Sequence, residues 1–429
     1  MSTPVQDVAQ ARPAKQKTEQ FLVTAEGTEA VAPGAWILHG QGQSMVFELD
    51  VGLVVVDAGP GGRVTEGMIR ALRQVSDAPV HAICFSHGHL GYNAGLEQWL
   101  AHARGRGEPK PRAIAHANMP RRALRYRETL ALQTRMAELQ FRRDAGVLEG
   151  KLPVPLPEET FEHSLLLGDA EGRHVELLWA PSETDDAIAV WYPAERLLYG
   201  GPSTIDSIPN VGTPFRTQRD PVRWADTLEH LATLKPALLV REFGASIAGE
   251  EAIASLLTHT AEALRWIRKE VVRLMNAGLS EPQMLAVIQF PAELFDVPFM
   301  KPTYGDPYWI ARDVYKSENG WWDRNPTTLH PAPPDQVSAA LGAAITDKQA
   351  VLRQARALAE QGETQLALHV IDLLAALQLA LPECEEARRL KAQWMTRRAS
   401  ETRSYISKSL YHASAKMLAE GHAADFGIR

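Results

Sequence analysis

Phe85-Ser86-His87-Gly88-His89-Leu90-Gly91-Tyr92-Asn93 is the stretch that decides the fold, and it follows the apolar run of residues 80–85. That run has the composition of a buried β-strand. Side chains two residues apart in an extended backbone project to the same side, so His87 and His89 can direct both imidazoles to one point. The pair alone is weak evidence for a metal site, because two histidines at this spacing are more often loop residues that bind no metal. Its surroundings decide whether it marks a metal site.

Short β-rich runs alternate with helical stretches and Gly/Pro turns from about residue 21 to residue 241, and this order predicts a layered α/β domain. Helical spacing covers residues 67–74 and the Arg-rich residues 121–143, which we expect to form one long helix with a solvated face. The predicted strands are residues 36–38, 44–47, 53–56, 80–85, 174–179, 187–192 and 237–240.

The pattern changes after Gly249, where apolar residues recur every three or four positions and β-rich runs stop. The aromatic residues within 290–334 favour packing or a dimer contact over a ligand role. We therefore predict an α/β fold in four parts: a disordered lead-in over 1–20, a first domain over 21–249, an all-α domain over 250–387, and a helical C-terminal extension over 388–429.

Composition excludes several classes of protein. The 429 residues carry a net charge of −7, which argues against a surface that binds nucleic acid or anionic lipid. Cys84 and Cys384 are the two cysteines, too few for a disulfide framework or a Cys-rich zinc module. No apolar run approaches the ~18 residues of a membrane span, and the first twenty residues lack a signal-like apolar stretch. We expect a cytoplasmic protein without a membrane partner.

The motifs together resemble the metallo-β-lactamase superfamily and, within it, the alkyl sulfatase group. The superfamily has a strand followed by His-x-His-x-Asp-His, which residues 87–92 resemble, and a strand ending in a structural Asp, which resembles residues 52–59 with Asp57. Further similar segments are residues 116–126, 180–193, 208–220 and 318–326. The resemblance implies an αββα sandwich followed by an all-α dimerisation domain. It also implies a homodimer, with Trp321 and Trp322 as expected anchors, and we expect no third, sterol-carrier-like domain.

The resemblance implies a metal site with an unusual feature. Family members bind two metals, and the residues that match the first set of ligands are His87, His89 and Glu183. The positions that match the second set carry Gly91, Tyr92, Pro202 and Phe243. Gly, Pro and Phe offer no donor atom to a metal. We therefore expect one metal ion per chain.

Two histidines and one carboxylate leave coordination positions open, which suits a catalytic Zn²⁺ with an acidified water. The same ligands suit non-haem Fe²⁺, so one Zn²⁺ per chain is expected with Fe²⁺ as the alternative. Glu183 has a second interpretation as a loop carboxylate paired with an arginine, in which case Glu242 or Asp186 would replace it. Asp186 is better explained as a hydrogen-bonding residue of the Thr-Asp-Asp turn.

The family's substrates are anionic, and the resemblance places Asn210 and Arg216 on the substrate's charged group, where the planar fork of an arginine suits an oxyanion. Tyr92 either donates to a substrate oxygen or fills the vacated second site. The leading function is a mononuclear metal-dependent hydrolase of a small anionic substrate, with no catalytic group beyond the metal-bound water. The alternatives are a non-catalytic ligand-binding or scaffold relative, and a non-haem iron enzyme of oxidative chemistry in a biosynthetic pathway.

Overall fold

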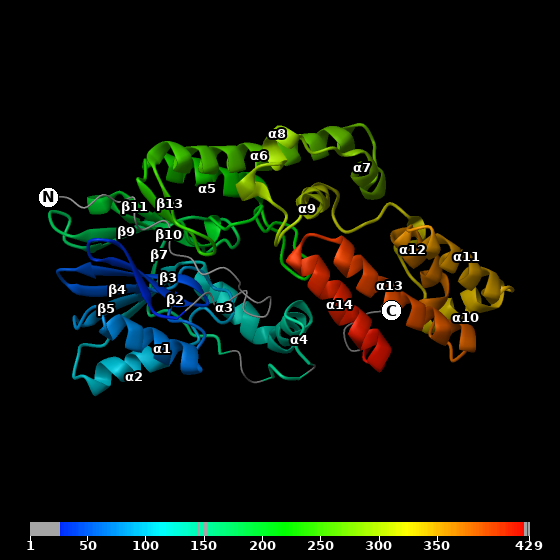
Figure 1. The fold of residues 1–429 in the computed structure, drawn as a ribbon, viewed down its shortest axis with the longest axis horizontal. Helices are drawn as coiled ribbons and strands as arrows, with labels where there is room; N and C mark the ends of the chain where they lie inside the picture. Colours follow the sequence, from blue (N-terminus) through cyan, green and yellow to red (C-terminus); the bar gives the residue numbers. More distant parts are fainter. Residues whose placement is uncertain (1–25, 145, 150–152, 424–426, 428–429) are drawn as a thin grey trace.

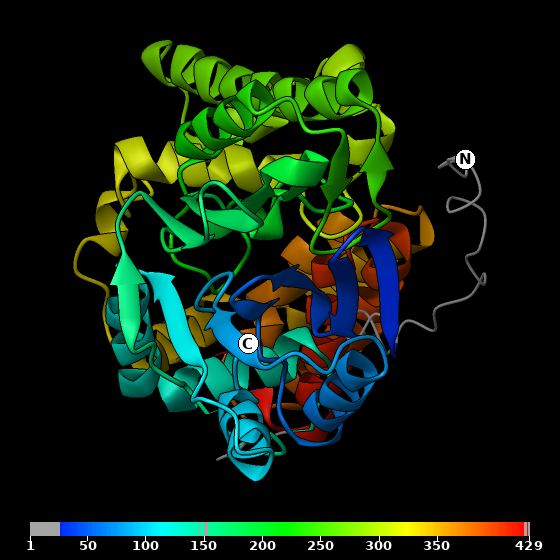
Figure 2. The same cartoon turned by 90° about the vertical axis from the view of Figure 1, so that its left-hand side faces the viewer.

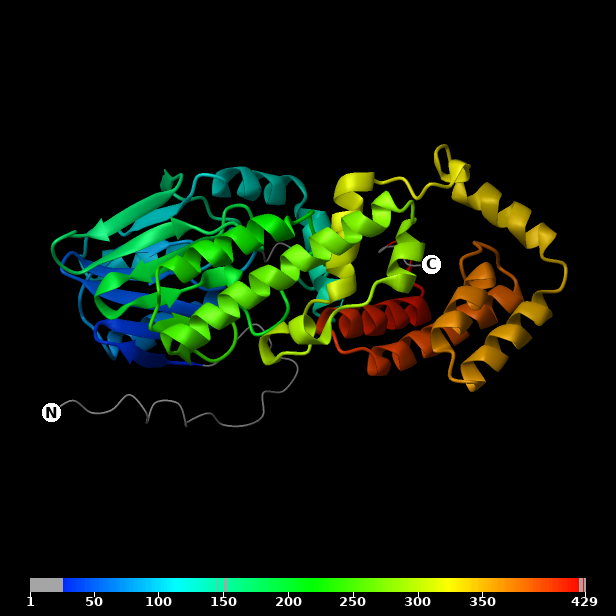
Figure 3. The same cartoon turned by 90° about the horizontal axis from the view of Figure 1, so that it is seen from above.

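The computed structural model describes residues 26–144, 146–149, 153–423 and 427, so the predicted lead-in over 1–20 lies outside the described residues. Two β-sheets lie face to face in the first half of the chain, with helices on both outer sides (Figures 1 and 2). A group of helices lies beside this sandwich, at the other end of the molecule (Figure 3). The fold is the expected αββα sandwich followed by an all-α part.

The first sheet contains the strand that leads into the histidine motif. Its strands follow chain order, antiparallel from β1 to β4 and parallel from β4 to β7. They are β1 (Thr28–Ala32), β2 (Ala35–Gly40), β3 (Gly42–Leu49), β4 (Gly52–Val56), β5 (Val80–Cys84), β6 (Arg112–His116) and β7 (Glu159–Phe161). Its outer face is covered by α1 (Gly62–Arg73), α2 (Leu96–Gly105) and α3 (Met119–Glu128).

The second sheet has the order β13-β12-β11-β10-β9-β8, and only the β11–β12 pair is parallel. Its strands are β8 (Ser164–Gly168), β9 (His174–Trp179), β10 (Ile188–Tyr192), β11 (Leu197–Tyr199), β12 (Leu238–Val240) and β13 (Ile247–Ala248). Its outer face carries α5 (Pro221–Thr233) and α6 (Glu250–Asn276), which run across the sheet in Figure 3. β4 and β10 are buried along their whole length, which explains their uninterrupted apolar sequences.

The helical half begins with α6, directly after β13. α6 shares one apolar core with α5 and with α9 (Pro307–Asn319). The expected domain boundary at residues 249 and 250 therefore falls between two elements, but the packing continues across it. The remaining helices are α7 (Glu281–Val287), α8 (Ala292–Phe295), α9 (Pro307–Asn319), α10 (Pro334–Ala344), α11 (Lys348–Glu360), α12 (Thr364–Ala375), α13 (Pro382–Glu401) and α14 (Tyr405–Glu420).

The last helix returns to the sandwich. α14 packs against α4 (Leu130–Gln140) through Leu139, Ala413 and Met417. The Tyr405 N–H donates to the carbonyl of Thr303 at 2.8 Å, so the start of α14 is also fixed to the aromatic-rich segment. The predicted C-terminal extension therefore packs on the first domain, where α14 supports α4.

The expectation of one long helix over residues 121–143 is wrong. Thr129 separates α3 from α4, with φ −103° and ψ 19°, outside the helical region. Its hydroxyl donates to the carbonyl of Arg125 at 2.7 Å, a side-chain bond that competes with regular helix geometry. All seven predicted strands are present, whereas β1, β6, β7, β8, β11 and β13 were not predicted. No helix in the described part of the chain combines the length and apolar character needed to cross a membrane.

Candidate metal centre

The histidine motif forms a loop that is fastened at both ends by Asp57, the residue after β4. Oδ1 of Asp57 accepts hydrogen bonds from the Ser86 N–H at 2.8 Å and from Nδ2 of Asn93 at 2.9 Å. Burial raises the pKa of Asp57 to about 6, although these bonds act in the opposite direction. Asp57 therefore has the structural role that the resemblance implied, and it sets where the loop leaves β5.

His87, His89 and Glu183 converge as predicted. Their ligand atoms all lie within 4.8 Å of one another. Nε2 of His87 is 2.8 Å from Nδ1 of His89, and Oγ of Ser86 is 2.9 Å from Nδ1 of His87. When Ser86 accepts the Nδ1 proton, the lone pair of Nε2 points to the cluster, which is how an outer partner orients a histidine ligand.

The protonation state of both imidazoles suits metal binding. Burial, with Arg122 and Arg219 nearby, lowers the pKa of His87 to about 3. Burial and the neighbouring His87 lower the pKa of His89 well below its ordinary value. Both rings are therefore neutral at neutral pH, the form in which imidazole binds a metal.

Glu183 is held by two donors that share one of its oxygens. Nδ2 of Asn210 donates to Oε1 at 2.6 Å, and the Arg219 guanidinium donates to the same atom at 3.1 Å. The Thr213 hydroxyl donates in turn to Oδ1 of Asn210. Oε2 remains for a metal, so the two interpretations of Glu183, ligand and ion-pair partner, are compatible. The residues present fit a metal ion with two nitrogen ligands and one oxygen ligand.

The two candidate substitutes for Glu183 lie outside this cluster. The carboxylate of Asp186 pairs with Nε of Arg122 at 2.7 Å. This pair lies directly over Gly88, where an added Cβ would be 2.7 Å from both Cδ of Arg122 and Oδ2 of Asp186. The glycine between the two histidines is thus required by a close approach of side chains.

Glu242 is buried, and neither of its carboxylate oxygens has a hydrogen-bond partner of standard geometry among the described residues. Burial and Glu183 raise the pKa of Glu242 well above the ordinary value, although the Tyr92 hydroxyl acts in the opposite direction.

The ring of Tyr92 packs on His87 with 4.3 Å between the ring centroids. An added Cβ at Gly91 would be 2.7 Å from Oε1 of Gln41. The space beside His87 is therefore filled by side chains.

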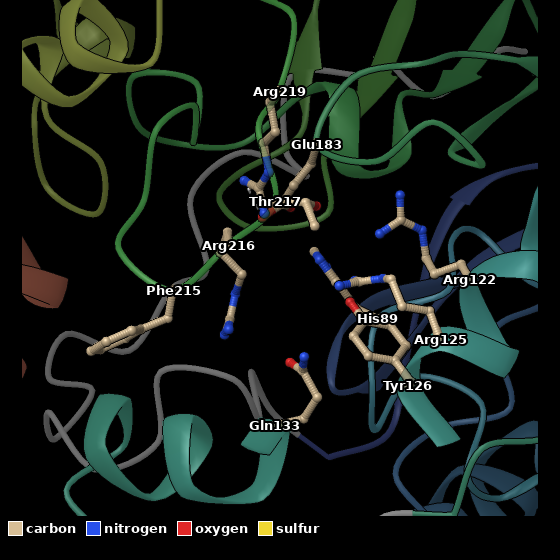
Figure 4. A pocket seen from close by; sticks show the side chains of 10 residues that line it. All are labelled: His89, Arg122, Arg125, Tyr126, Gln133, Glu183, Phe215, Arg216, Thr217 and Arg219. Atoms are coloured by element: carbon tan, nitrogen blue, oxygen red, sulfur yellow. Dashed lines mark hydrogen bonds and ion pairs between the residues drawn. The ribbon is translucent and has the colours of Figure 1, made fainter. Parts of the chain in front are cut away.

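A small cavity opens beside His89 and Glu183 of the cluster (Figure 4). The empty space between its lining atoms, including the open mouth, has a volume of about 250 Å³. The centre of a water molecule can occupy about 10 Å³ of this space. That is room for about one water. The cavity is lined by His89, Arg122, Arg125, Tyr126, Gln133, Glu183, Phe215, Arg216, Thr217 and Arg219.

The cavity includes one of the three predicted substrate residues. Arg216 lines it, whereas Asn210 donates to Glu183 and Tyr92 packs on the ring of His87, and neither of these two residues lines the cavity. Arg125 and Gln133, from α3 and α4, were not anticipated, because the Arg-rich stretch was interpreted as a solvated face. The usable signal was the spacing of Arg122 and Arg125, which places them on the same side of a helix.

Two family models match the chain. The model described as the metallo-beta-lactamase superfamily matches residues 38–241, and the model described as alkyl sulfatase dimerisation matches residues 280–421. The second match begins after α6 and extends through most of α14.

Curated relatives and solved structures agree with these matches. A linear primary-alkylsulfatase of a Pseudomonas species is 27% identical over 340 residues, which cover 75% of this chain and 64% of that protein. An (R)-specific secondary-alkylsulfatase of Pseudomonas is 23% identical over 404 residues, 88% of this chain and 60% of that protein. The structure of a stereoselective inverting sec-alkylsulfatase from Pseudomonas is similar with a TM-score of 0.79 at 20% identity, covering 92% of this chain and 66% of that one. The chain thus spans less than two thirds of the length of these proteins.

Proposed function

We propose that this chain, which belongs to the alkyl sulfatase-like group of the metallo-β-lactamase superfamily, is a hydrolase that uses one metal ion to cleave a small anionic ester. The observation that carries the proposal is the convergence of His87, His89 and Glu183 beside a cavity lined by four arginines. Three protein ligands next to a cavity are the pattern of a catalytic metal site rather than a closed structural one. Arginines are the side chains that best match an oxyanion.

The single-ion proposal is supported by the side chains at the second-site positions. Gly91, Pro202 and Phe243 carry no donor atoms, and Tyr92 packs against His87. Zn²⁺ is the proposed ion, with Fe²⁺ as the alternative, because both accept two imidazoles and a carboxylate.

The side chains around the proposed metal site have different roles in hydrolysis. A bound divalent ion supplies an acidified water that is nucleophilic at neutral pH. Arg219 and Asn210 fix the orientation of Glu183, and Arg216 lines the cavity where the charged group of the ester would lie. In the overall reaction one water is consumed and one ester bond breaks. A sulfate ester gives an alcohol, sulfate and a proton, whereas a phosphate monoester dianion gives an alcohol and hydrogen phosphate.

The test begins with the protein purified without added metal. Elemental analysis and the absorption spectrum are expected to give about one zinc per chain without a visible band, and the loaded protein is expected to hydrolyse hexyl sulfate or hexyl phosphate. His89→Ala should lose both the metal and the activity. Two metals per chain would contradict the single-ion proposal, and a fully loaded protein that hydrolyses no anionic ester would contradict the hydrolase. Iron with turnover of dioxygen would favour the oxidative alternative.

We also propose a homodimer in the cytoplasm. The match of residues 280–421 to a dimerisation family and the exposure of the Trp321 side chain, 71%, support an interface in the helical half. Cys84 and Cys384 are both unpaired and buried, which supports a reducing compartment.

A further inference from the structure

Two of the four guanidiniums in the cavity are neutralised by carboxylates. Arg219 pairs with Glu183 at 3.1 Å. Arg122 pairs with Asp186 at 2.7 Å and also with Asp185. These arginines hold the protein's own acidic groups in place, so they are not available to balance a ligand's charge.

The other two guanidiniums have neutral neighbours. The Arg125 guanidinium lies over the ring of Tyr126, 4.8 Å from its centroid, and Arg216 donates to the side-chain carbonyl of Gln140. In the described part of the chain, neither Arg125 nor Arg216 forms an ion pair with a carboxylate. Both are only partly exposed, and Figure 4 shows both reaching into the cavity from opposite walls, Arg125 from α3 and Arg216 from the loop before α5.

The charges around the cavity therefore do not balance. Four arginines against Glu183, Asp185 and Asp186 leave one positive charge, and a divalent ion at the cluster would raise this to three. Partly buried charges of the same sign repel one another more strongly than they would in water. A ligand with two negative charges offsets more of this excess than a ligand with one.

We propose that the cavity selects a headgroup with two negative charges, of the phosphate monoester kind, over a monoanionic sulfate ester, and that Arg125 and Arg216 are the residues that make this selection. The inference rests on the proposed function, because it names the substrate class for the same site. The headgroup is larger than the one water for which the cavity has room, so Arg216 would turn away from Gln140 to admit it. Its bond to a neutral amide would then be exchanged for one to a charged oxygen, and each arginine would donate two hydrogen bonds to the oxyanion. The alkyl part of the ester would leave the cavity past Phe215, whose side chain is 44% exposed.

The test is a binding measurement by calorimetry on the metal-loaded protein with three probes of equal chain length. Hexyl phosphate carries two charges, whereas hexyl sulfate and the diester hexyl methyl phosphate each carry one. We expect hexyl phosphate to bind about tenfold more tightly than either monoanion, since one charged hydrogen bond contributes about that factor. Arg125→Gln should remove most of this preference while it weakens hexyl sulfate binding by less. Arg216→Gln should act in the same direction.

Arg121→Gln is the matched control, because it removes the same charge from an exposed position of the same helix and should leave all three affinities unchanged. Equal affinity for hexyl phosphate and hexyl sulfate would overturn the inference, as would a loss in Arg125→Gln that is equal for all three probes. A protein that prefers the dianion but hydrolyses nothing would refute the proposed function alone. A protein that hydrolyses hexyl sulfate without preferring the dianion would refute this inference alone.

Discussion

Asn210 and Arg219 donate to the same oxygen of Glu183, at 2.6 Å and 3.1 Å, and Arg219 also donates to the backbone carbonyl of Asn210. The three side chains thus form a closed unit in which the loop before α5 fixes a carboxylate from the β9–β10 connection. Burial lowers the pKa of Arg219, although Glu183 acts in the opposite direction. Neither of these two hydrogen bonds uses the second oxygen of Glu183, so it remains for a metal.

Arg219→Gln is therefore expected to weaken metal affinity by about 10–100-fold, the usual effect of removing a residue that orients a metal ligand. The expected cause is that Glu183 loses its charged partner and gains freedom to rotate. Competition with a chromogenic chelator measures the affinity. Arg265→Gln, which removes an exposed ion pair with Asp226 and Glu229 on the outer helices, is the control and should bind metal like the unchanged protein. Unchanged affinity in Arg219→Gln would show that Glu183 needs no such support.

His87→Ala should abolish metal binding, because it removes a nitrogen donor from the three-residue cluster. Phe243→Ala should keep one metal per chain, since the phenylalanine offers no donor atom. Elemental analysis of both purified variants decides the matter. A Phe243→Ala protein that binds less than half an equivalent, while its thermal unfolding is unchanged, would contradict the assignment of the ligands.

Gly88→Ala should reduce both stability and metal binding, because its Cβ would be 2.7 Å from the buried Arg122–Asp186 pair. We expect a loss of about 1–3 kcal/mol in the free energy of unfolding, the usual cost of overpacking. Gly67→Ala is the control in the interior of α1, where the nearest neighbour of the added Cβ is an arginine tip at 3.8 Å. It should stabilise the protein by about 0.5–1 kcal/mol. Denaturant unfolding of both variants gives the comparison, and equal stability of the two would show that the loop relaxes.

Asp57 predicts a specific pH dependence of stability. Its pKa is about 6 in the folded protein against an ordinary value of 3.8, so the unfolded chain loses this proton first as pH rises. The contribution of Asp57 to stability is therefore highest below pH 4 and is lost by about pH 6, and a difference of about two units corresponds to about 3 kcal/mol. The stability of the unchanged protein relative to Asp57→Asn should fall by about this amount between pH 4 and pH 7. A difference that is constant across this range would show that Asp57 is already ionised at pH 4.

The dimer is tested by light scattering at micromolar concentration, where we expect twice the mass of 47.3 kDa. Replacement of both Trp321 and Trp322 by serine should shift the protein toward the monomer, because large exposed rings are typical anchors of an interface. Val51→Ser removes an exposed apolar side chain in the turn between β3 and β4 and is the control. If the protein without substitutions is monomeric at this concentration, the dimer is refuted.

The sequence was sufficient for the elements with uniform apolar runs, such as β4 and β10, because strands buried on both faces have no polar interruptions. It failed for β6, whose five residues Arg112–His116 begin and end with charged or polar side chains, and for β8, whose burial is incomplete. Strands of this kind are recognised only through the neighbours with which they pair.

The convergence of His87, His89 and Glu183 was predictable, because the two histidines follow one strand end at a spacing of two. The cavity beside them was not predictable. Gln133 lines the cavity from a second helix because Thr129 ends α3 and the chain turns into α4, a local break that the continuous helical pattern hid. Asn210 was expected on the substrate, but its partner Glu183 comes from another loop, and a single sequence carries no information on that pairing.

The contact between α4 and α14 determines when this site can be completed during synthesis. Lys416 on α14 pairs with Asp144, which lies 272 positions earlier, and Met417 packs against Leu139. Domains generally fold from the N-terminus as the chain emerges from the ribosome. His87, His89 and Glu183 emerge early, but α4, the helix that carries Gln133 and Gln140, gains its support from α14 only after residue 417 has been made. A nascent chain can therefore bring the proposed metal ligands together well before it has a finished pocket, and products truncated before α14 would retain the first without the second.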